Sequence, residues 1–239
     1  LMGVLNAVMF APEDMRIVKD APAERRRFVD MEISQLRPAY YYALQRYNQA
    51  LKQKNALLKT GTDRILMEAL DEQLAAAGEV IMNGRAVFIE TLCGISAKLY
   101  GEIAGSAETL SVRYIPNAVS EGNFTRDALM EAFLRAASED ARRGFATAGP
   151  HRDDVGIALT GRDARTFGSQ GQQRTAALAL RLSEIELFQK ENGEPPVLLL
   201  DDVLSELDDM RQELLLTRIG GCQTILTAAS LQRLEKAKI

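Results

Sequence analysis

Apolar residues recur at helical spacing through a long central part of the chain, from Ala23 to about Ser106. Within it, residues three, four and seven positions apart form one apolar face: Leu44, Tyr47, Leu51 and Leu58. Pro38 suits the first turn of this helix, and Gly61 suits its end. The pattern predicts helices that pack on one another rather than a ligand site.

The stretch that follows carries the same periodicity, with apolar residues at Met67, Leu70, Leu74, Ile81, Phe88, Leu92, Ile95, Leu99 and Ile103. Four glycines interrupt it, namely Gly78, Gly84, Gly94 and Gly101. Because glycine destabilises a helix interior, we expect two helices or one kinked helix here rather than a rigid rod. No long heptad array is present, which excludes an extended coiled coil. No uninterrupted apolar run approaches the roughly 18 residues of a membrane span.

Strand patterns lie on both sides of this helical part. Leu1 to Phe10 and Gln223 to Thr227 are apolar enough for strands, and Leu110 to Tyr114 alternates between apolar and polar residues. Val155 to Leu159 alternates as well and leads into Thr160–Asp163, which predicts a hairpin turn. A mixed α/β fold follows from this order of elements.

The most informative strand is Val197 to Leu200, whose continuous apolar run predicts burial on both faces. Asp201 and Asp202 follow at its carboxyl end, where open α/β sheets bind their ligands. One carboxylate there can hold Mg²⁺ through its water shell, and the other can orient or deprotonate an attacking water. Paired aspartates after a strand also occur as ordinary loop residues. Further along, Asp208 is placed to cap the next helix.

A second chemical feature is the helix start at Ser169 to Gln172. Ser169 and Gln172 have the spacing of a capping box, in which each side chain bonds the other residue's backbone N–H. Gly171 has no Cβ, so an outside group can approach the backbone closely. Free N–H groups and the helix dipole would suit a phosphate, although most capping boxes only cap a helix.

Composition narrows the class of protein. The 239 residues are 46% hydrophobic and 26% charged, which is typical of a globular protein. Only two cysteines occur, at Cys93 and Cys222, and this excludes a disulfide framework and fits a reducing cytoplasm.

Charge is distributed unevenly. The net charge is −4, yet the first sixty residues hold ten basic and six acidic residues. A basic segment on an acidic body can still bind phosphates, and the candidates for DNA contacts are Arg25, Arg26, Arg27, Lys52 and Lys54. The alternative is a solvated helix face. The single histidine, His151, lies in GPHRDD, where a structural role is the simpler interpretation.

The turn, the helix and the aspartate-ended strand follow one another along the chain as SQGQQRT and LLLDDVLSELD. In this order they resemble the signature motif, Walker B strand and D-loop of ABC-type ATPases. The residues of these two segments are similar to those of the RecF family, whose members are bacterial relatives of the SMC and Rad50 heads. PEDMRIVKDAPAERRRFVD, YNQALKQKNALLK and GPHRDD also resemble RecF segments, so the resemblance covers essentially the whole chain.

The resemblance implies an α/β fold that is part of an ABC-type ATPase head, the C-terminal part of lobe I, with a helical second lobe. Residues 1–15 would be a core strand and its connecting turn, 16–106 the helical lobe, and 107–239 the rest of the ATPase core. The family also carries a P-loop, G-x-x-x-x-G-K-[ST], which is absent from this sequence. We therefore expect a segment with that motif ahead of Leu1.

The resemblance further implies a cytoplasmic protein that binds ATP and Mg²⁺, forms a homodimer on ATP and clamps DNA. Its DNA substrates would be single-stranded gaps and junctions with double-stranded DNA. Its protein partners would be RecO and RecR, and no membrane would be involved. The complete protein would be a weak, DNA-stimulated ATPase, whereas this chain without a Walker A motif would be inactive.

Roles carry over to matching residues only. Ser169, Gln170, Gly171 and Gln172 would cover the γ-phosphate held by a partner protomer. Asp201 would hold Mg²⁺ through water, Asp202 would orient the attacking water, and Ser205 and Asp208 would form the D-loop. His151 and Arg152 would lie near the nucleotide or the partner.

Two departures from the ABC pattern keep an alternative open. ABC transporters carry a switch histidine where this chain has Thr227 to Ser230, so the γ-phosphate sensor is unassigned. Most ABC proteins have glutamate in place of Asp202, and a shorter carboxylate can place the water poorly. The alternative is a structural DNA-binding module of the SMC type that does not hydrolyse ATP.

Overall fold

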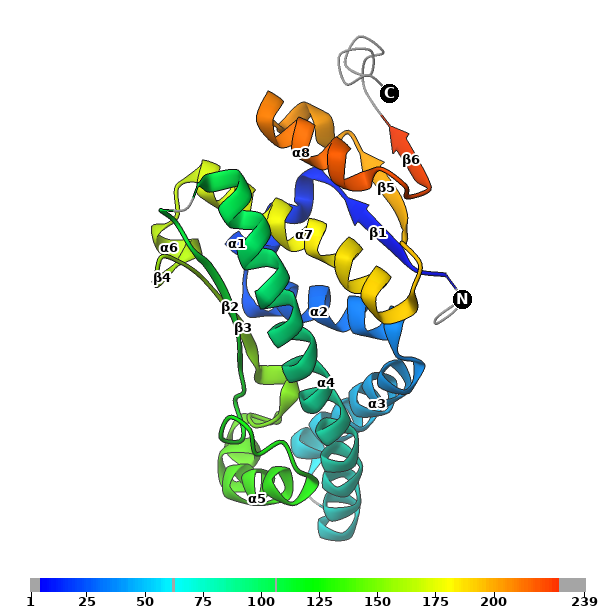
Figure 1. Cartoon of the computed structure of the whole chain (residues 1–239). Coiled ribbons are helices and arrows are strands. Elements are labelled where there is room, and N and C mark those ends of the chain that lie inside the picture. The colour runs from blue at the N-terminus through cyan, green and yellow to red at the C-terminus, as the bar shows by residue number, and fades with distance from the viewer. Residues whose placement is uncertain (1–4, 62, 106, 228–239) are drawn as a thin grey trace.

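The computed structural model describes residues 5–61, 63–105 and 107–227, apart from the side chains of Ser205 and Glu206. Figure 1 shows two small sheets held together by long helices. The helices are α1 (Arg16–Lys19), α2 (Pro22–Leu36), α3 (Pro38–Thr60), α4 (Arg64–Ala104), α5 (Arg126–Arg143), α6 (Ala164–Phe167), α7 (Gln170–Asn192) and α8 (Asp209–Ile219). Short 3₁₀ helices are η1 (Pro12–Met15), η2 (Pro150–Arg152) and η3 (Val203–Glu206).

One sheet is parallel, with β1 (Ala7–Phe10) and β6 (Thr224–Thr227) on either side of β5 (Val197–Asp201). The predicted strands at 155–159 and 110–114 pair antiparallel as β3 (Asp154–Leu159) and β2 (Leu110–Ile115) in the second sheet. The hairpin prediction is confirmed, because Thr160 and Gly161 both have positive φ and lead into β4 (Arg162–Asp163).

Burial of β5 on both faces is a prediction that the structure corrects. Leu198 and Leu200 are buried, whereas Val197 and Leu199 on the other face are only partly covered. Leu199 pairs in register with Met9 and Ile225, which are 45% and 57% exposed. The run is apolar on both faces, but the described helices cover only one of them.

Helix α4 runs unbroken from Arg64 to Ala104 and forms the spine of the molecule in Figure 1. The two-helix alternative is therefore wrong. At Gly84 an added Cβ would lie 2.7 Å from Cδ2 of Tyr40, and at Gly78 it would lie 2.9 Å from Cδ1 of Leu129. These two glycines let neighbouring elements approach the helix closely, so they serve packing rather than a break.

Helix α4 meets a length and composition criterion for membrane spans, although the sequence has no uninterrupted apolar run of that length. Among the described residues it is long and apolar enough to cross a bilayer by length and composition. Its apolar stripes pack against α3, α5, α7 and β2, with Leu70, Ile81 and Leu92 almost fully buried. This is the behaviour of a core helix, which meets the same criterion.

Buried ion pairs join the helices to the antiparallel sheet. Arg85 of α4 is 2% exposed, and its Nε and Nη2 donate to the two carboxylate oxygens of Asp30, both at 2.9 Å. Its Nη1 donates to the carbonyl of Pro150 at 2.7 Å and to Asp153 at 3.1 Å. Tyr40 donates to Asp30 and Tyr114 donates to Asp153, so both acids are fully engaged.

We expect Gly84→Ala to lower the free energy of unfolding by about 1–3 kcal/mol, because the added methyl group would overlap the buried ring of Tyr40. Gly94→Ala is the matched control, since a Cβ there meets no atom within 4 Å. It should be neutral or stabilising by up to ~1 kcal/mol through helix propensity. Urea unfolding of both variants measures the difference, and equal effects would contradict the packing role of Gly84.

Candidate nucleotide-responsive site

The turn at Ser169 begins α7 with the predicted capping box. The hydroxyl of Ser169 accepts from the backbone N–H of Gln172 at 3.2 Å, and Oε1 of Gln172 accepts from the N–H of Ser169 at 2.8 Å. Gln170 and Gly171 are exposed at the surface. A Cβ at Gly171 would lie no closer than 4.0 Å to any described residue, so none of them requires glycine there. The open backbone leaves room for an outside group to approach.

A short bridge that sequence reasoning missed holds this turn to α4. Nε2 of Gln172 donates to one carboxylate oxygen of Glu108 at 2.8 Å, and the Tyr100 hydroxyl donates to the other at 2.7 Å. These two hydrogen bonds lower the pKa of Glu108. Glu108 stands in the loop between α4 and β2, and only the folded chain brings it to the start of α7.

Asp201 ends β5 and Asp202 follows it, as expected, but the surroundings of the two residues differ. Asp201 is exposed and accepts from the hydroxyl of Thr227 at 2.6 Å. Asp202 takes the left-handed conformation, with φ 46°, and its N–H donates to the carbonyl of Thr227 at 3.2 Å. Aspartate is one of the few residues with a side chain that tolerates this conformation. Ala228 to Ser230, which correspond to the position of the switch histidine in ABC transporters, lie outside the described residues.

The predicted D-loop is attached directly to the predicted signature turn, which is Ser169 to Gln172. Asp208 caps α8 by accepting from the N–H of Arg211 at 3.0 Å, and it also pairs with the Arg211 guanidinium. The same guanidinium donates to the hydroxyl of Thr175 at 2.7 Å and to the carbonyl of Gly171 at 3.3 Å. Arg211 therefore joins the starts of α7 and α8 into one unit. The side chain of Ser205 lies outside the described part of the chain.

A buried charge cluster connects α7 to the turn after β1. Arg181 of α7 bonds Asp14 of η1 at 2.8 Å and Glu184 at 3.1 Å, and it lies 3.6 Å from Glu32 of α2. Burial raises the pKa of Asp14 and Glu184, and it raises that of Glu32 to about 7. Three acids thus face one arginine in a place that charge patterns along the sequence do not reveal.

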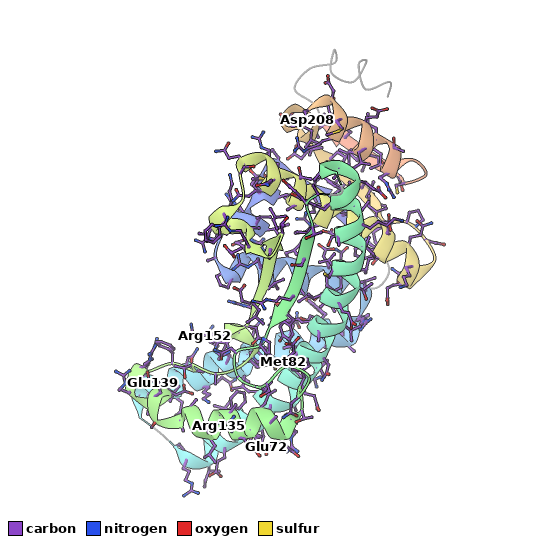
Figure 2. The ribbon with its side chains drawn as sticks, turned by 60° about the vertical axis from the view of Figure 1, so that its left-hand side comes forward. Glu72, Met82, Arg135, Glu139, Arg152 and Asp208 are labelled. Carbon is purple, nitrogen blue, oxygen red and sulfur yellow. The ribbon has the colours of Figure 1, made fainter. Side chains whose placement is uncertain are left out.

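His151 and Arg152 lie elsewhere. Nδ1 of His151 accepts from the Tyr47 hydroxyl at 2.8 Å and Nε2 donates to the carbonyl of Ala146 at 3.0 Å. Arg152 donates to the same carbonyl and stacks on Phe145. Figure 2 shows Arg152 beside the α5 end of the molecule and Asp208 at the opposite end. Within this chain these residues do not join the signature turn, which favours the structural interpretation of His151.

Only some residues of the predicted basic patch lie at the surface of the protein. Arg25 is 8% exposed and forms a two-point ion pair with Asp154, at 2.8 and 2.9 Å. Lys54 is 2% exposed and lies 2.6 Å from Asp71 and 3.4 Å from Asp140. Both therefore drop out as DNA contacts, because their charges are already neutralised inside the fold. Of the five candidates, Lys52 and Arg27 are exposed, and Arg26 is half-buried.

The His151 contacts give a direct pH prediction. Burial of the ring, with smaller contributions from the positive charges of Arg152 and Arg26, lowers the pKa of His151 to about 4. The neutral ring therefore contributes stability that is present above its unfolded pKa of about 6.5 and is lost as the pH falls towards 4. NMR titration of the chain's single histidine should show the low value. His151→Gln should flatten the stability profile between these pH values, and an unshifted titration would contradict the buried, neutral ring.

Comparison with known proteins places this geometry in a family. No protein-family model matches the chain. The DNA replication and repair protein RecF of Alkaliphilus oremlandii is 44% identical over 243 residues, covering 100% of this chain and 67% of the relative. RecF of an Exiguobacterium species is 44% identical over 252 residues, covering 100% and 68%. The chain thus spans about two thirds of these relatives.

Solved structures agree with the sequence comparison. The recombination mediator protein RecF with ATPrS, in the RecFOR pathway, superposes with a TM-score of 0.90 at 38% identity, covering 97% of this chain and 64% of that one. RecF with ATP gives a TM-score of 0.86 at 39% identity, covering 96% and 64%. The predicted fold, part of an ABC-type ATPase head with a helical lobe, is confirmed. Sequence and fold together show that this chain belongs to the RecF family of DNA replication and repair proteins.

Proposed function

We propose that this chain supplies the signature-motif half of an ATP-driven DNA clamp that acts in recombinational repair. The observation that carries the proposal is the exposed, capped turn at Ser169, with its open backbone at Gly171 and its link through Arg211 to the D-loop. Such a turn suits a phosphate presented by a second protomer. Its relatives include RecF structures with ATP and ATPrS, which supports ATP as the nucleotide.

In this proposal the two aspartates divide the chemistry. Asp201 is exposed at the strand end, so its carboxylate can face the water shell of Mg²⁺. Among the described residues no group of three metal-binding side chains occurs, which suits an ion held mostly by water and nucleotide phosphates. The ion would neutralise charge on the phosphates. Asp202 would orient the water that attacks the γ-phosphate.

The wider role follows from the relatives. They are DNA replication and repair proteins, and the solved ones belong to the RecFOR pathway. We extend this to a cytoplasmic homodimer that closes on ATP, binds single-stranded gaps and junctions with double-stranded DNA, and works with RecO and RecR. The complete protein would be a weak, DNA-stimulated ATPase. Within it, residues 16–106 would form the helical lobe and 1–15 with 107–239 the ATPase core.

A second candidate is a clamp of the SMC type that binds ATP without hydrolysing it. The observation that favours it is the aspartate at position 202, whose shorter side chain reaches less far than glutamate. Turnover by the complete protein, measured with and without DNA, separates the two. ATP hydrolysis stimulated by DNA would exclude the structural clamp, and ATP-dependent dimers without turnover would exclude the ATPase.

For the aspartates, we expect Asp202→Asn in the complete protein to abolish turnover while ATP binding persists and the ATP-bound dimer becomes longer-lived. Asparagine tolerates the left-handed conformation but cannot accept a proton. Asp201→Asn should instead weaken Mg²⁺-dependent nucleotide binding. Nucleotide titration and sedimentation measure both effects. Equal loss of ATP binding in the two variants would contradict this division of roles.

For the signature turn, we expect Ser169→Arg to leave ATP binding intact but prevent the ATP-dependent dimer. Arginine removes the cap, at about 1 kcal/mol, and puts a long side chain where the partner must close. The positive charge of the arginine would attract the phosphate. The partner protomer must approach Gly171 closely, however, which leaves little room for the long side chain, so steric repulsion should outweigh the electrostatic attraction. Ser169→Asn is the matched control, because it keeps the cap and should dimerise normally. Normal dimers of the arginine variant, measured by sedimentation with ATP, would reduce Ser169 to an ordinary helix cap.

A further inference from the structure

A hollow of about 480 Å³ opens on the side of the helical lobe, away from the signature turn. It is formed by α2, α3 and α4 with the η2 turn, and we call it the α2–α3 hollow. Its lining includes Arg26, Arg27, Met31, Tyr41, Leu44 and Asn48. Its volume falls within the roughly 300–1,000 Å³ typical of small-ligand sites.

The unpaired charge at this hollow is positive. The Arg26 guanidinium donates to the carbonyl of Asp153 at 2.6 Å, and among the described residues no carboxylate forms an ion pair with Arg26 or Arg27. Asp30, which also lines the hollow, is engaged at both oxygens by Arg85. Burial, and then the charge of Arg85, lower the pKa of Arg26. A partly desolvated cation with spare donors is suited to an anionic ligand.

Most of the remaining lining is apolar or aromatic. Leu44, Met31 and the ring of Tyr41 line the hollow beside the arginines, and Met31 is 43% exposed. A free phosphate would leave this surface unused, whereas a base stacked on an aromatic ring would cover it. Asn48 is exposed at the hollow and offers both a donor and an acceptor to a base edge.

Buried ion pairs hold the helix that carries Arg26 and Arg27 in place. The neighbouring Arg25 is fixed by its two-point pair with Asp154, and Arg85 ties α4 to α2 and to the η2 turn. The buried ion pairs that hold the hollow therefore leave Arg26 and Arg27 without a carboxylate partner among the described residues. This explains why only part of the basic run near residue 25 is available to a ligand.

We propose that the α2–α3 hollow binds one unpaired nucleotide of single-stranded DNA, with its phosphate on Arg26 and Arg27 and its base against Tyr41 and Leu44. The proposal rests on the DNA-binding function proposed above and adds a site to it. An acidic protein segment with apolar residues is the competing occupant. Arginine with an aromatic ring is the combination that single-strand binding sites use, and it favours the nucleotide.

The test measures binding of a fluorescein-labelled oligothymidylate to the complete protein with saturating ATP, by anisotropy at several salt concentrations. Tyr41→Ala should weaken binding about 5- to 150-fold, as loss of one stacked base does, and Tyr41→Phe should restore it. Arg27→Gln should reduce the salt slope by about 0.7, the value for one phosphate contact to a single strand. Arg46→Gln is the matched control on an exposed position of α3 outside the hollow, and it should change neither quantity.

The outcomes separate this proposal from the one it rests on. Wild-type protein that binds no oligothymidylate would overturn the hollow, and the DNA-binding function would be overturned with it only if a gapped duplex also failed to bind. Normal wild-type binding with Tyr41→Ala and Arg27→Gln matching the control would overturn the hollow alone. A polyglutamate peptide that binds the wild type but not these two variants, with oligonucleotide binding unchanged, would assign the hollow to an acidic protein segment. Circular dichroism of each variant confirms that it is folded.

Discussion

The Arg85 guanidinium imposes the constraint on which the arrangement of this chain depends. Arg85 is 2% exposed, so its charge must be balanced and its N–H groups satisfied within the protein. Its partners come from α2, through Asp30, and from the segment between α5 and β3, through Pro150 and Asp153. Removing one partner of such a pair leaves an uncompensated buried charge, at a cost of about 3–5 kcal/mol. The geometry of α2, α4 and the edge of β3 is thereby fixed together.

A second buried arginine with several acidic partners lies on α7, the helix that begins at the proposed site. Arg181 gathers Asp14, Glu32 and Glu184, so α7 is tied to the turn after β1 and to α2. One end of that helix carries the turn at Ser169, and Arg211 ties this turn to the start of α8. Each arginine joins elements from distant parts of the sequence. Together they hold the turn at Ser169, the start of α8 and the η1 turn after β1 in one arrangement.

Local features of the fold could be predicted from the sequence, because their causes lie within a few residues. The Ser169 capping box, the start of α3 at Pro38 and the Thr160–Gly161 turn depend on neighbouring side chains and backbone conformation. The fates of Arg25 and Lys54 could not be predicted in this way. Their partners, Asp154 and Asp140, are far along the chain, and a run of charges does not show which members are paired. The packing role of Gly78 and Gly84 in α4 could not be predicted for the same reason, because the Leu129 methyl group and the Tyr40 ring that approach them belong to other elements.

The backbone conformation at position 202 gives a reason for aspartate there that is separate from catalysis. A shorter carboxylate than glutamate suggests weaker placement of an attacking water, which is the basis for a clamp without hydrolysis. The backbone offers a separate reason for aspartate, because position 202 has φ 46° and its N–H is held by Thr227. Aspartate and asparagine adopt this conformation more readily than glutamate. Replacing Asp202 with glutamate would therefore alter both side-chain reach and backbone strain, so a loss of activity could not be assigned to reach. Asparagine keeps the backbone preference and removes only the charge, which makes it the substitution that isolates the chemistry of this residue.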